Sequence, residues 1–165
     1  MKRRVFGIGA LATLTVAGCS TSKFRSYDGP EVTSIVVNKG ERQMYLLHNE
    51  HILKNYHFEL GFAPTGDKKI EGDGKTPEGT YTINRRNPNS SFHLSLGISY
   101  PNAHDIAEAR ALGEKPGGEI FIHGQPNLTR AKGPDWTAGC IAVKNREIEQ
   151  IYAMVNNGTI ITLRA

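Results

Sequence analysis

The 165-residue sequence predicts one mostly β domain with two short helices, the α+β class. Runs rich in β-branched residues follow one another with short polar turns between them, which is typical of strands and hairpins. Helical periodicity is convincing in only two stretches, residues 102–112 and 145–155. Because the strands follow one another without regular helical crossovers, a doubly wound α/β fold is not expected.

The first half of the chain is expected to form strands. Residues 32–39 are rich in β-branched side chains, residues 43–47 follow a Lys-Gly-Glu turn, and residues 52–60 follow a His-Asn-Glu-His turn. Runs joined by such short polar turns predict hairpins. A glycine-rich loop at residues 66–79 then leads into a further strand at residues 80–84.

Four more strands are expected in the second half, and each is bounded by turn residues or a helix. They are residues 92–100, 119–123, 139–143 and 159–164.

The two helices carry start and stop signals. Asn102 is suited to cap the first helix and Gly113 to end it, and an Asn-Gly pair at 157–158 stops the second. Apolar residues at helical spacing predict the face that each helix turns to the core. These faces are Ile106, Ala109 and Leu112 in the first helix, and Ile148, Ile151, Tyr152 and Val155 in the second.

The N-terminus reads as a targeting segment. A Lys-Arg-Arg head and a short apolar run end in Val-Ala-Gly-Cys, which resembles the lipobox of bacterial lipoproteins. We therefore expect a signal peptide at residues 1–18, a lipidated Cys19, a tether at residues 19–31 and a catalytic domain at residues 32–165. Ser20 favours the outer membrane facing the periplasm, by resemblance to lipoprotein sorting. An ordinary secretory signal or an uncleaved anchor with a chance cysteine are the alternatives.

Removal of the predicted signal peptide would change the net charge of the chain, and lipidation of Cys19 would change which cysteines are free. The signal peptide holds three basic and no acidic residues, so a net charge of +4 falls to about +1 without it. No polybasic stripe remains, and nucleic-acid binding is not expected. The chain has two cysteines, and lipidation of Cys19 leaves Cys140 as a lone thiol in an oxidising compartment.

Two familiar site types are excluded. Gly74-Lys75-Thr76 suggests a phosphate loop, but that motif requires glycine at position 69, which is Lys69. His48 and His51 lack clustered carboxylate or thiol partners at zinc-ligand spacing. We expect His48 and His51 in a solvated turn, His57 at the surface, and His93 and His104 in structural roles or near a cleft.

One histidine and one cysteine have the pattern of a catalytic pair. His123 ends an apolar strand before Gly124, and Cys140 follows 17 positions later, directly after Gly139. A neighbouring imidazole can lower a thiol pKa from roughly 8.5 and create a nucleophile. A glycine before the cysteine allows close approach of substrate and leaves backbone N–H groups for an oxyanion. The alternative is a buried inert cysteine and a histidine that merely ends a strand.

Three motifs together resemble the YkuD-type L,D-transpeptidases, cysteine enzymes of bacterial cell-wall metabolism. They are the Gly-Lys-Thr-Pro-Glu-Gly-Thr-Tyr stretch at 74–81, Ile-His-Gly at 122–124, and Thr-Ala-Gly-Cys-Ile at 137–141. They occur in the family's order, and the resemblance covers roughly residues 32–164.

The resemblance implies a mixed β-sandwich-like catalytic domain that transfers acyl groups on peptidoglycan stem peptides. Cys140 would attack the carbonyl of meso-diaminopimelate and form a thioester, with His123 as general base and then acid. The Gly139 and Cys140 amides would hold the oxyanion. An amine acceptor gives transpeptidation and water gives hydrolysis. No metal or organic cofactor is implied.

The chain departs from the family at Ala138, usually His, Ser or Arg, and at Ala142, usually an Arg that suits a substrate carboxylate. Gly124, Trp136 and Thr137 are expected to contact substrate. The Asp-Trp-Thr stretch at 135–137 resembles a branch that includes a murein hydrolase (amidase) releasing wall-linked lipoprotein. Charge to replace the missing Arg could come from Arg85, the choice for substrate binding, or from Arg86, Lys132 or Arg146.

A non-catalytic peptidoglycan-binding lipoprotein is the rival from another class, and the missing Arg is its only support. A papain-like protease is disfavoured because its cysteine precedes its histidine.

Overall fold

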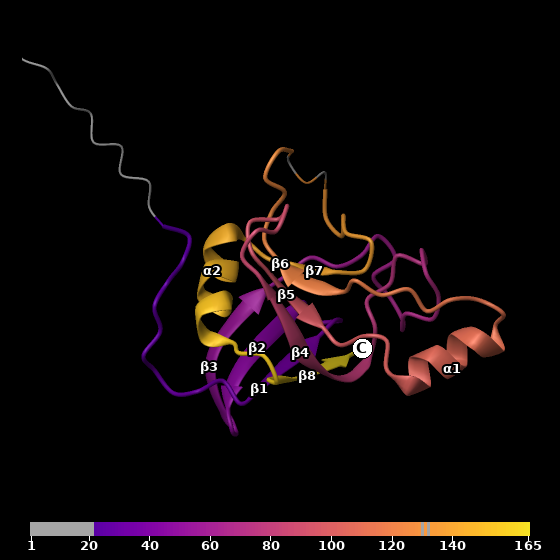
Figure 1. The fold of residues 1–165 in the computed structure, drawn as a ribbon, viewed down its shortest axis with the longest axis horizontal. Helices are drawn as coiled ribbons and strands as arrows, with labels where there is room; N and C mark the ends of the chain where they lie inside the picture. The colour runs from indigo at the N-terminus through magenta and orange to yellow at the C-terminus, as the bar shows by residue number, and fades with distance from the viewer. Residues whose placement is uncertain (1–21, 130, 132) are drawn as a thin grey trace, which may run out of the picture.

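Eight strands form one curled sheet in the computed structural model of the chain, which describes residues 22–129, 131 and 133–165 (Figure 1). The predicted signal peptide at 1–18 and Cys19 lie outside the described residues. The strand order is β3-β2-β1-β8-β4-β5-β6-β7. The elements are β1 (Ser34–Asn38), β2 (Gln43–His48), β3 (His51–His57), β4 (Gly79–Asn87), β5 (Ser95–Ile98), α1 (Ala103–Ala111), β6 (Phe121–His123), β7 (Ile141–Ala142), α2 (Asn145–Met154) and β8 (Ile160–Arg164).

The predicted hairpins are confirmed at the start of the sheet. β1 pairs antiparallel with β2, and β2 pairs antiparallel with β3. β8 enters between β1 and β4, parallel to the first and antiparallel to the second. Side chains alternate between core and solvent along β1, where Ile35 and Val37 are fully buried. This period of two fixes which face of each strand joins the core.

The curled sheet nearly closes on itself, and the closure builds the region around the two candidate catalytic residues. After β3 the chain runs on to Glu59, which exchanges backbone hydrogen bonds of 2.8 and 2.9 Å with Ala142 of β7. Leu60 accepts a bond of 3.1 Å from the Thr137 N–H. The first and last strands of the sheet are thus joined beside the cysteine loop.

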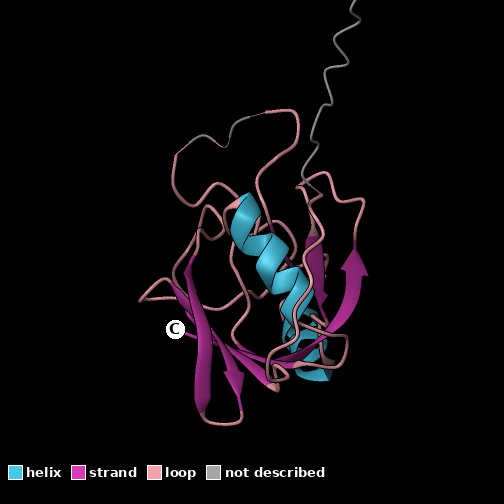
Figure 2. Cartoon of the chain, turned by 90° about the vertical axis from the view of Figure 1, so that its left-hand side faces the viewer, coloured by secondary structure: helices cyan, strands magenta, loops and turns pink. Residues whose placement is uncertain are grey.

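The two helices lie at opposite ends of the molecule in Figure 1. Figure 2 is viewed from the α2 side, so the two helices overlap there. α2 packs Ile148, Ile151 and Val155 into the core as expected. Asn102 caps α1, with its side chain accepting the N–H of His104 and Asp105. These observations confirm both helices and the Asn102 cap.

The expected apolar face of α1 is wrong. Ile106 and Leu112 are 47% and 60% exposed, and the buried residues are Ala109 and Asp105. Asp105 turns inward because its carboxylate accepts hydrogen bonds from the Tyr81 hydroxyl, both at 3.1 Å, and from the Asn102 N–H. A buried polar group with several partners outweighs two apolar side chains on a short helix.

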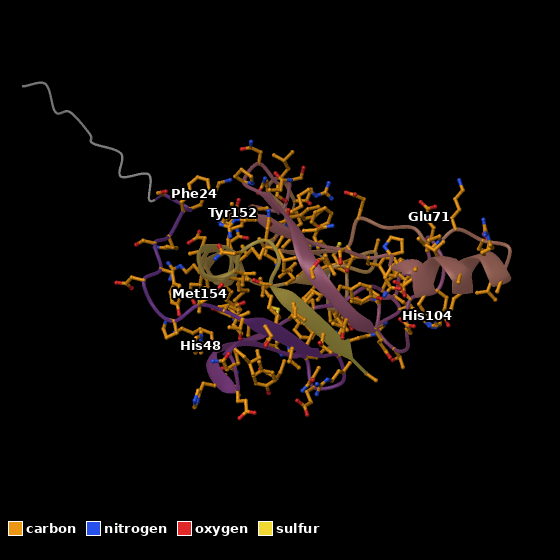
Figure 3. The ribbon with its side chains drawn as sticks, turned by 60° about the horizontal axis from the view of Figure 1, so that its bottom comes forward. Phe24, His48, Glu71, His104, Tyr152 and Met154 are labelled. Carbon is orange, nitrogen blue, oxygen red and sulfur yellow. The ribbon has the colours of Figure 1, made fainter. Side chains whose placement is uncertain are left out.

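The segment before β1 contains no helix or strand over residues 22–31, but it packs along α2. Arg25 pairs with Glu149 at 2.6 Å, and Phe24 lies against Tyr152 with 6.5 Å between ring centroids (Figure 3). Lys23 donates to the carbonyls of Pro88 and His93, so this segment also holds the loop before β5. No helix within the described residues is long and apolar enough to cross a membrane.

Candidate active site

Cys140 and His123 line the same depression, which has a volume of about 490 Å³. His123 ends β6 and Cys140 immediately precedes β7, and these two strands pair in parallel. Adjacent parallel strands thus bring together two residues that lie 17 positions apart. The other lining residues are Asn87, Ser90, Ser91, Phe92, Ser95, Glu119, Phe121, Trp136, Thr137 and Ala138.

The turn that carries Cys140 depends on Gly139. Its φ of +126° is one that residues with a side chain rarely adopt, and a Cβ there would lie 2.5 Å from the Lys75 carbonyl oxygen. The buried Thr76 hydroxyl donates 2.8 Å to the Gly139 carbonyl. The glycine-rich loop is therefore a support for the cysteine turn, which explains why both motifs occur together.

The Thr137 hydroxyl ties the same turn from within. Its Oγ1 donates 2.7 Å to the Cys140 carbonyl and accepts the Gly139 N–H at 3.2 Å. Thr137 is 5% exposed, so its hydroxyl is engaged inside the turn although it lines the depression. The Gly139 N–H, which was expected in the oxyanion hole, is therefore hydrogen-bonded to the Thr137 hydroxyl. The Cys140 N–H donates to no atom of the described residues.

The imidazole of His123 is held in one orientation. Its Nδ1 lies 2.7 Å from the Gly124 carbonyl oxygen, which can only accept, so Nδ1 carries the proton and Nε2 is left with its lone pair. The ring lies 4.5 Å from the Phe92 ring and 5.6 Å from the Trp136 ring, between centroids. A backbone carbonyl and two aromatic rings thus fix the tautomer and the plane of the ring.

Both groups are neutral at rest. Burial lowers the pKa of His123, and the hydrogen bond to Gly124 only partly opposes this. Burial raises the pKa of the Cys140 thiol to about 11, the Glu119 carboxylate adds to the rise, and the Phe121 N–H opposes it. This direction is opposite to the one a neighbouring imidazole can produce, because loss of hydration outweighs the neighbouring groups. The thiol donates weakly to the Glu119 carbonyl at 3.4 Å.

The other expected substrate residues fall in different places. Trp136 lines the depression, whereas Gly124 is buried against α2, where a Cβ would lie 2.6 Å from Asn145 Oδ1. Trp136 also borders a second depression of about 910 Å³, which Phe62 and Leu128 line on its far side. Gly124 therefore shapes the chain and orients His123 through its carbonyl.

Among the described cations proposed to replace the family's Arg, Arg85 is the one that contacts residues lining the site. It pairs with Glu119 at 3.0 Å and lies 4.7 Å from the centre of the Phe121 ring. Arg86 is held over the Tyr152 ring and donates to the Val155 carbonyl. Arg146 borders a separate depression along α2, and Lys132 lies outside the described residues.

Ala142, where the family carries that Arg, is 1% exposed in β7, with its backbone bonded to Glu59.

The remaining histidines lie away from the thiol. His93 Nε2 is 2.9 Å from a Glu149 oxygen, and His48 Nδ1 is 2.8 Å from the Glu31 carbonyl. His104 is exposed near Glu108, and His51 and His57 are exposed on β3. Over the described ranges, no three His, Cys, Asp or Glu residues form a group that could hold a metal ion.

Sequence reasoning missed several residues of the site. Phe92 stacks on His123 from the loop before β5, although residue 92 was expected to begin a strand. Asp135 pairs with Arg42 and accepts the Leu60 N–H at 2.9 Å, so it anchors the loop before the cysteine. Asp135 has a φ of +50°, and an Asp before a Trp-Thr pair offers a weak signal of such a turn.

Comparison with known proteins identifies related chains. The family model described as "YkuD: L,D-transpeptidase catalytic domain" matches residues 33–163. A relative from Escherichia coli (strain K12), named "Putative L,D-transpeptidase YafK", is 32% identical over 128 residues, which are 76% of this chain and 44% of that protein. The chain thus spans less than half the length of this relative.

Solved structures give the same picture. A mutant of the helical cell shape determining protein Pgp2 from Campylobacter jejuni is 29% identical, with a TM-score of 0.64 over 84% of this chain and 48% of that one. Bd1075 of Bdellovibrio bacteriovorus, at 24% identity, has a TM-score of 0.56 over 81% of this chain and 48% of its own. The second likeness concerns the fold alone.

Proposed function

The chain belongs to the YkuD family of L,D-transpeptidase catalytic domains, and from this membership we propose that it performs cysteine-dependent acyl transfer on peptidoglycan stem peptides. The observation that carries the proposal is that Cys140 and His123 line one depression, with the His123 tautomer fixed by the Gly124 carbonyl. A thiol and an imidazole with a free Nε2 are the two groups that such a transfer needs.

The first half-reaction starts from a neutral thiol. Cys140 Sγ attacks the carbonyl carbon of diaminopimelate while His123 Nε2 takes the thiol proton, so the charge forms only as the new C–S bond forms. The tetrahedral intermediate then breaks its C–N bond. The leaving amine takes the proton from His123, and a thioester on Cys140 remains.

The second half-reaction restores the enzyme. An acceptor amine, or water, adds to the thioester carbonyl and gives its proton to His123 Nε2. The C–S bond then breaks and the proton returns to the Cys140 sulfur. The Cys140 N–H, which donates to none of the described residues, is our choice as oxyanion donor, and the Gly139 N–H would join it by leaving Thr137.

Hydrolysis of wall-linked lipoprotein is the second candidate, favoured by the branch-like stretch Asp135-Trp136-Thr137. The same pair of residues serves both reactions, and the access of water to the thioester decides between them. The non-catalytic alternative is weakened by the shared depression and the fixed imidazole, since a binding protein needs neither.

The test uses tetrapeptide muropeptides, with and without an added amine acceptor, and lipoprotein-linked sacculi, with products read by mass spectrometry. We expect amine adducts from the wild type and no products from Cys140→Ala. Lys54→Ala, on an exposed strand position, serves as the matched control. Identical product profiles from the wild type and Cys140→Ala would exclude an enzymatic role.

We further propose that the chain is exported and lipid-anchored through Cys19, at the outer membrane facing the periplasm, and that its activity shapes the cell wall. The lipobox-like sequence supports the anchor, and the relation to a protein named for helical cell shape supports the wall role. Palmitate labelling in cells should be lost in Cys19→Ala and kept in Cys140→Ala. Labelling of both variants would refute the anchor.

A further inference from the structure

A third depression, of about 700 Å³, adjoins the one that holds Cys140. Glu119 and Ala138 line both, so the two depressions meet beside the thiol. Ala138 is exposed and small, and it is one of the positions where the chain departs from its family. A larger side chain there would narrow this passage. The rest of the lining is Lys68, Glu71, Gly72, Lys115, Pro116, Gly117 and Gly118.

This third depression carries uncommitted charge of both signs. Lys115 and Glu71 are exposed, and neither side chain makes a salt bridge or hydrogen bond with the part of the chain that the structure describes. Lys68 is different, because its ammonium is 3% exposed and bonded to Asp73 at 2.9 Å. One ammonium and one carboxylate thus remain available to a ligand.

The walls of the third depression are fixed before any ligand arrives. The Glu71 N–H donates 2.7 Å to the Lys115 carbonyl, which ties the loop before β4 to the loop after α1. Gly117 has a φ of +76°, and a Cβ there would lie 3.2 Å from the Glu71 Cα. Pro116 accepts the Tyr100 hydroxyl at 3.0 Å. Figure 3 shows Glu71 at the α1 end of the molecule, on the side of this loop.

We propose that the third depression binds a zwitterionic amino-acid group, the free amino and carboxylate groups at the side-chain end of diaminopimelate. Lys115 holds the carboxylate, and Glu71 holds the ammonium. This assignment rests on the proposed function, which places the reacting carbonyl of the same residue at Cys140. Three methylene groups separate the reacting end of diaminopimelate from its side-chain end. These methylene groups would lie in the passage beside Ala138, where the two depressions meet.

In this proposal Lys115 and Glu71 of the third depression recognise the charged side-chain end of the donor, and Lys115 takes the place of the missing Arg as the partner of a substrate carboxylate. Lys115 and Glu71 are solvated, so each contact adds a modest preference. Together they require both signs on the ligand: a singly charged side chain pairs with one of the two residues, and an uncharged side chain pairs with neither. The site therefore separates diaminopimelate peptides by the state of that far end.

The experiment compares two donor tetrapeptides, one with the side-chain carboxylate of diaminopimelate free and one with it amidated. We expect the wild type to favour the free acid by about three- to fivefold in kcat/KM, the effect of one solvent-exposed ion pair. Lys115→Ala should bring the ratio close to one, and Lys115→Glu should invert it. Lys54→Ala is the matched control and should keep the wild-type ratio.

The outcomes separate the two proposals. Turnover by the wild type with the same ratio in Lys115→Ala, or with no preference at all, overturns the zwitterion site and leaves the acyl transfer standing. No turnover of either peptide by the wild type refutes the proposed function, and the site falls with it. Glu71→Gln gives a second readout, since it should reduce the preference for a free over an acetylated side-chain amine.

Discussion

Replacing Thr76 by valine tests whether the glycine-rich loop supports the cysteine turn. Valine has nearly the shape of threonine, so the change removes one hydroxyl from a site that is fully buried. That hydroxyl donates 2.8 Å to the Gly139 carbonyl, and no other hydrogen bond reaches this carbonyl from the described residues. The variant therefore leaves a buried acceptor unpaired beside the nucleophile.

The expected cost follows from this geometry. Leaving a buried carbonyl without a partner costs about 1–3 kcal/mol of folding free energy. For a domain of this size, about 2 kcal/mol corresponds to a fall in Tm of roughly 6–8 °C. The turn that carries Cys140 also loses one of its stabilising hydrogen bonds. A displacement of a catalytic group by about 1 Å can lower the rate about a hundredfold. We expect kcat/KM to fall about ten- to a hundredfold.

The assay combines thermal unfolding followed by circular dichroism with turnover of a tetrapeptide donor. Thr76→Ser keeps the hydroxyl and should recover most of both quantities. Thr80→Val is the control, because Thr80 is exposed and its hydroxyl has only a contact of 3.3 Å with Thr162. If Thr76→Val matches Thr80→Val in Tm and in kcat/KM, the supporting role of this hydrogen bond is refuted.

Three further predictions follow from the charges. Because burial raises the pKa of Cys140 to about 11, alkylation by iodoacetamide should rise about tenfold per pH unit between pH 7 and 10, and a plateau below pH 8 would contradict this. Because the pKa of His123 lies below its ordinary value, kcat/KM should hold at pH 6.5 and fall only in more acidic buffer; a fall that begins above pH 7 would argue against His123 as the base. The hydrogen bonds from Arg42 and the Leu60 N–H outweigh burial and lower the pKa of Asp135. The stability that this carboxylate contributes is therefore fully present above its pKa in the unfolded chain, and it is lost as the pH falls through its pKa in the folded protein. Asp135→Asn should cost about 1 kcal/mol at pH 7, and urea unfolding should show this cost shrinking below pH 4; a constant difference would refute the linkage.

The presence of the strands and the ends of both helices were predictable because they depend on local patterns. Two strands are nevertheless shorter than expected: residues 92–100 contain only β5 (Ser95–Ile98), and residues 139–143 only β7 (Ile141–Ala142). Content of β-branched residues predicted the strand that contains β1, and Asn102 marked the start of α1 as its cap. The buried face of α1 was not predictable, because it depends on Tyr81, which reaches Asp105 from another strand. Periodicity counts apolar residues and gives no information on such a pairing.

Some features of the candidate site were likewise predictable from the sequence, and others were not. The three motifs predicted that Cys140 and His123 would belong to one site, and both residues line the same depression. The direction of the thiol pKa was not predictable, since it depends on how far the fold removes water from the sulfur. Phe92 was also beyond reach, because the loop that carries it is positioned by the Asn127 amide and by Lys23. These contacts join positions dozens of residues apart.

The spacing of the glycines explains why the motifs of this site occur as a set. A Cβ on Gly61 would lie 2.0 Å from the Gly74 carbonyl oxygen and 2.7 Å from the Gly139 nitrogen, so three segments touch backbone to backbone. Such contacts tolerate no side chain at Gly61, while Gly74 and Gly139 are also required by their positive φ angles of +70° and +126°. The Thr76 hydroxyl and the Lys75 carbonyl then act on Gly139 across the same contact. A change in any one segment would move the cysteine turn, even though only that turn carries a reactive group. The Gly-Lys-Thr-Pro stretch is therefore part of the catalytic architecture through packing, without contributing a side chain to the chemistry.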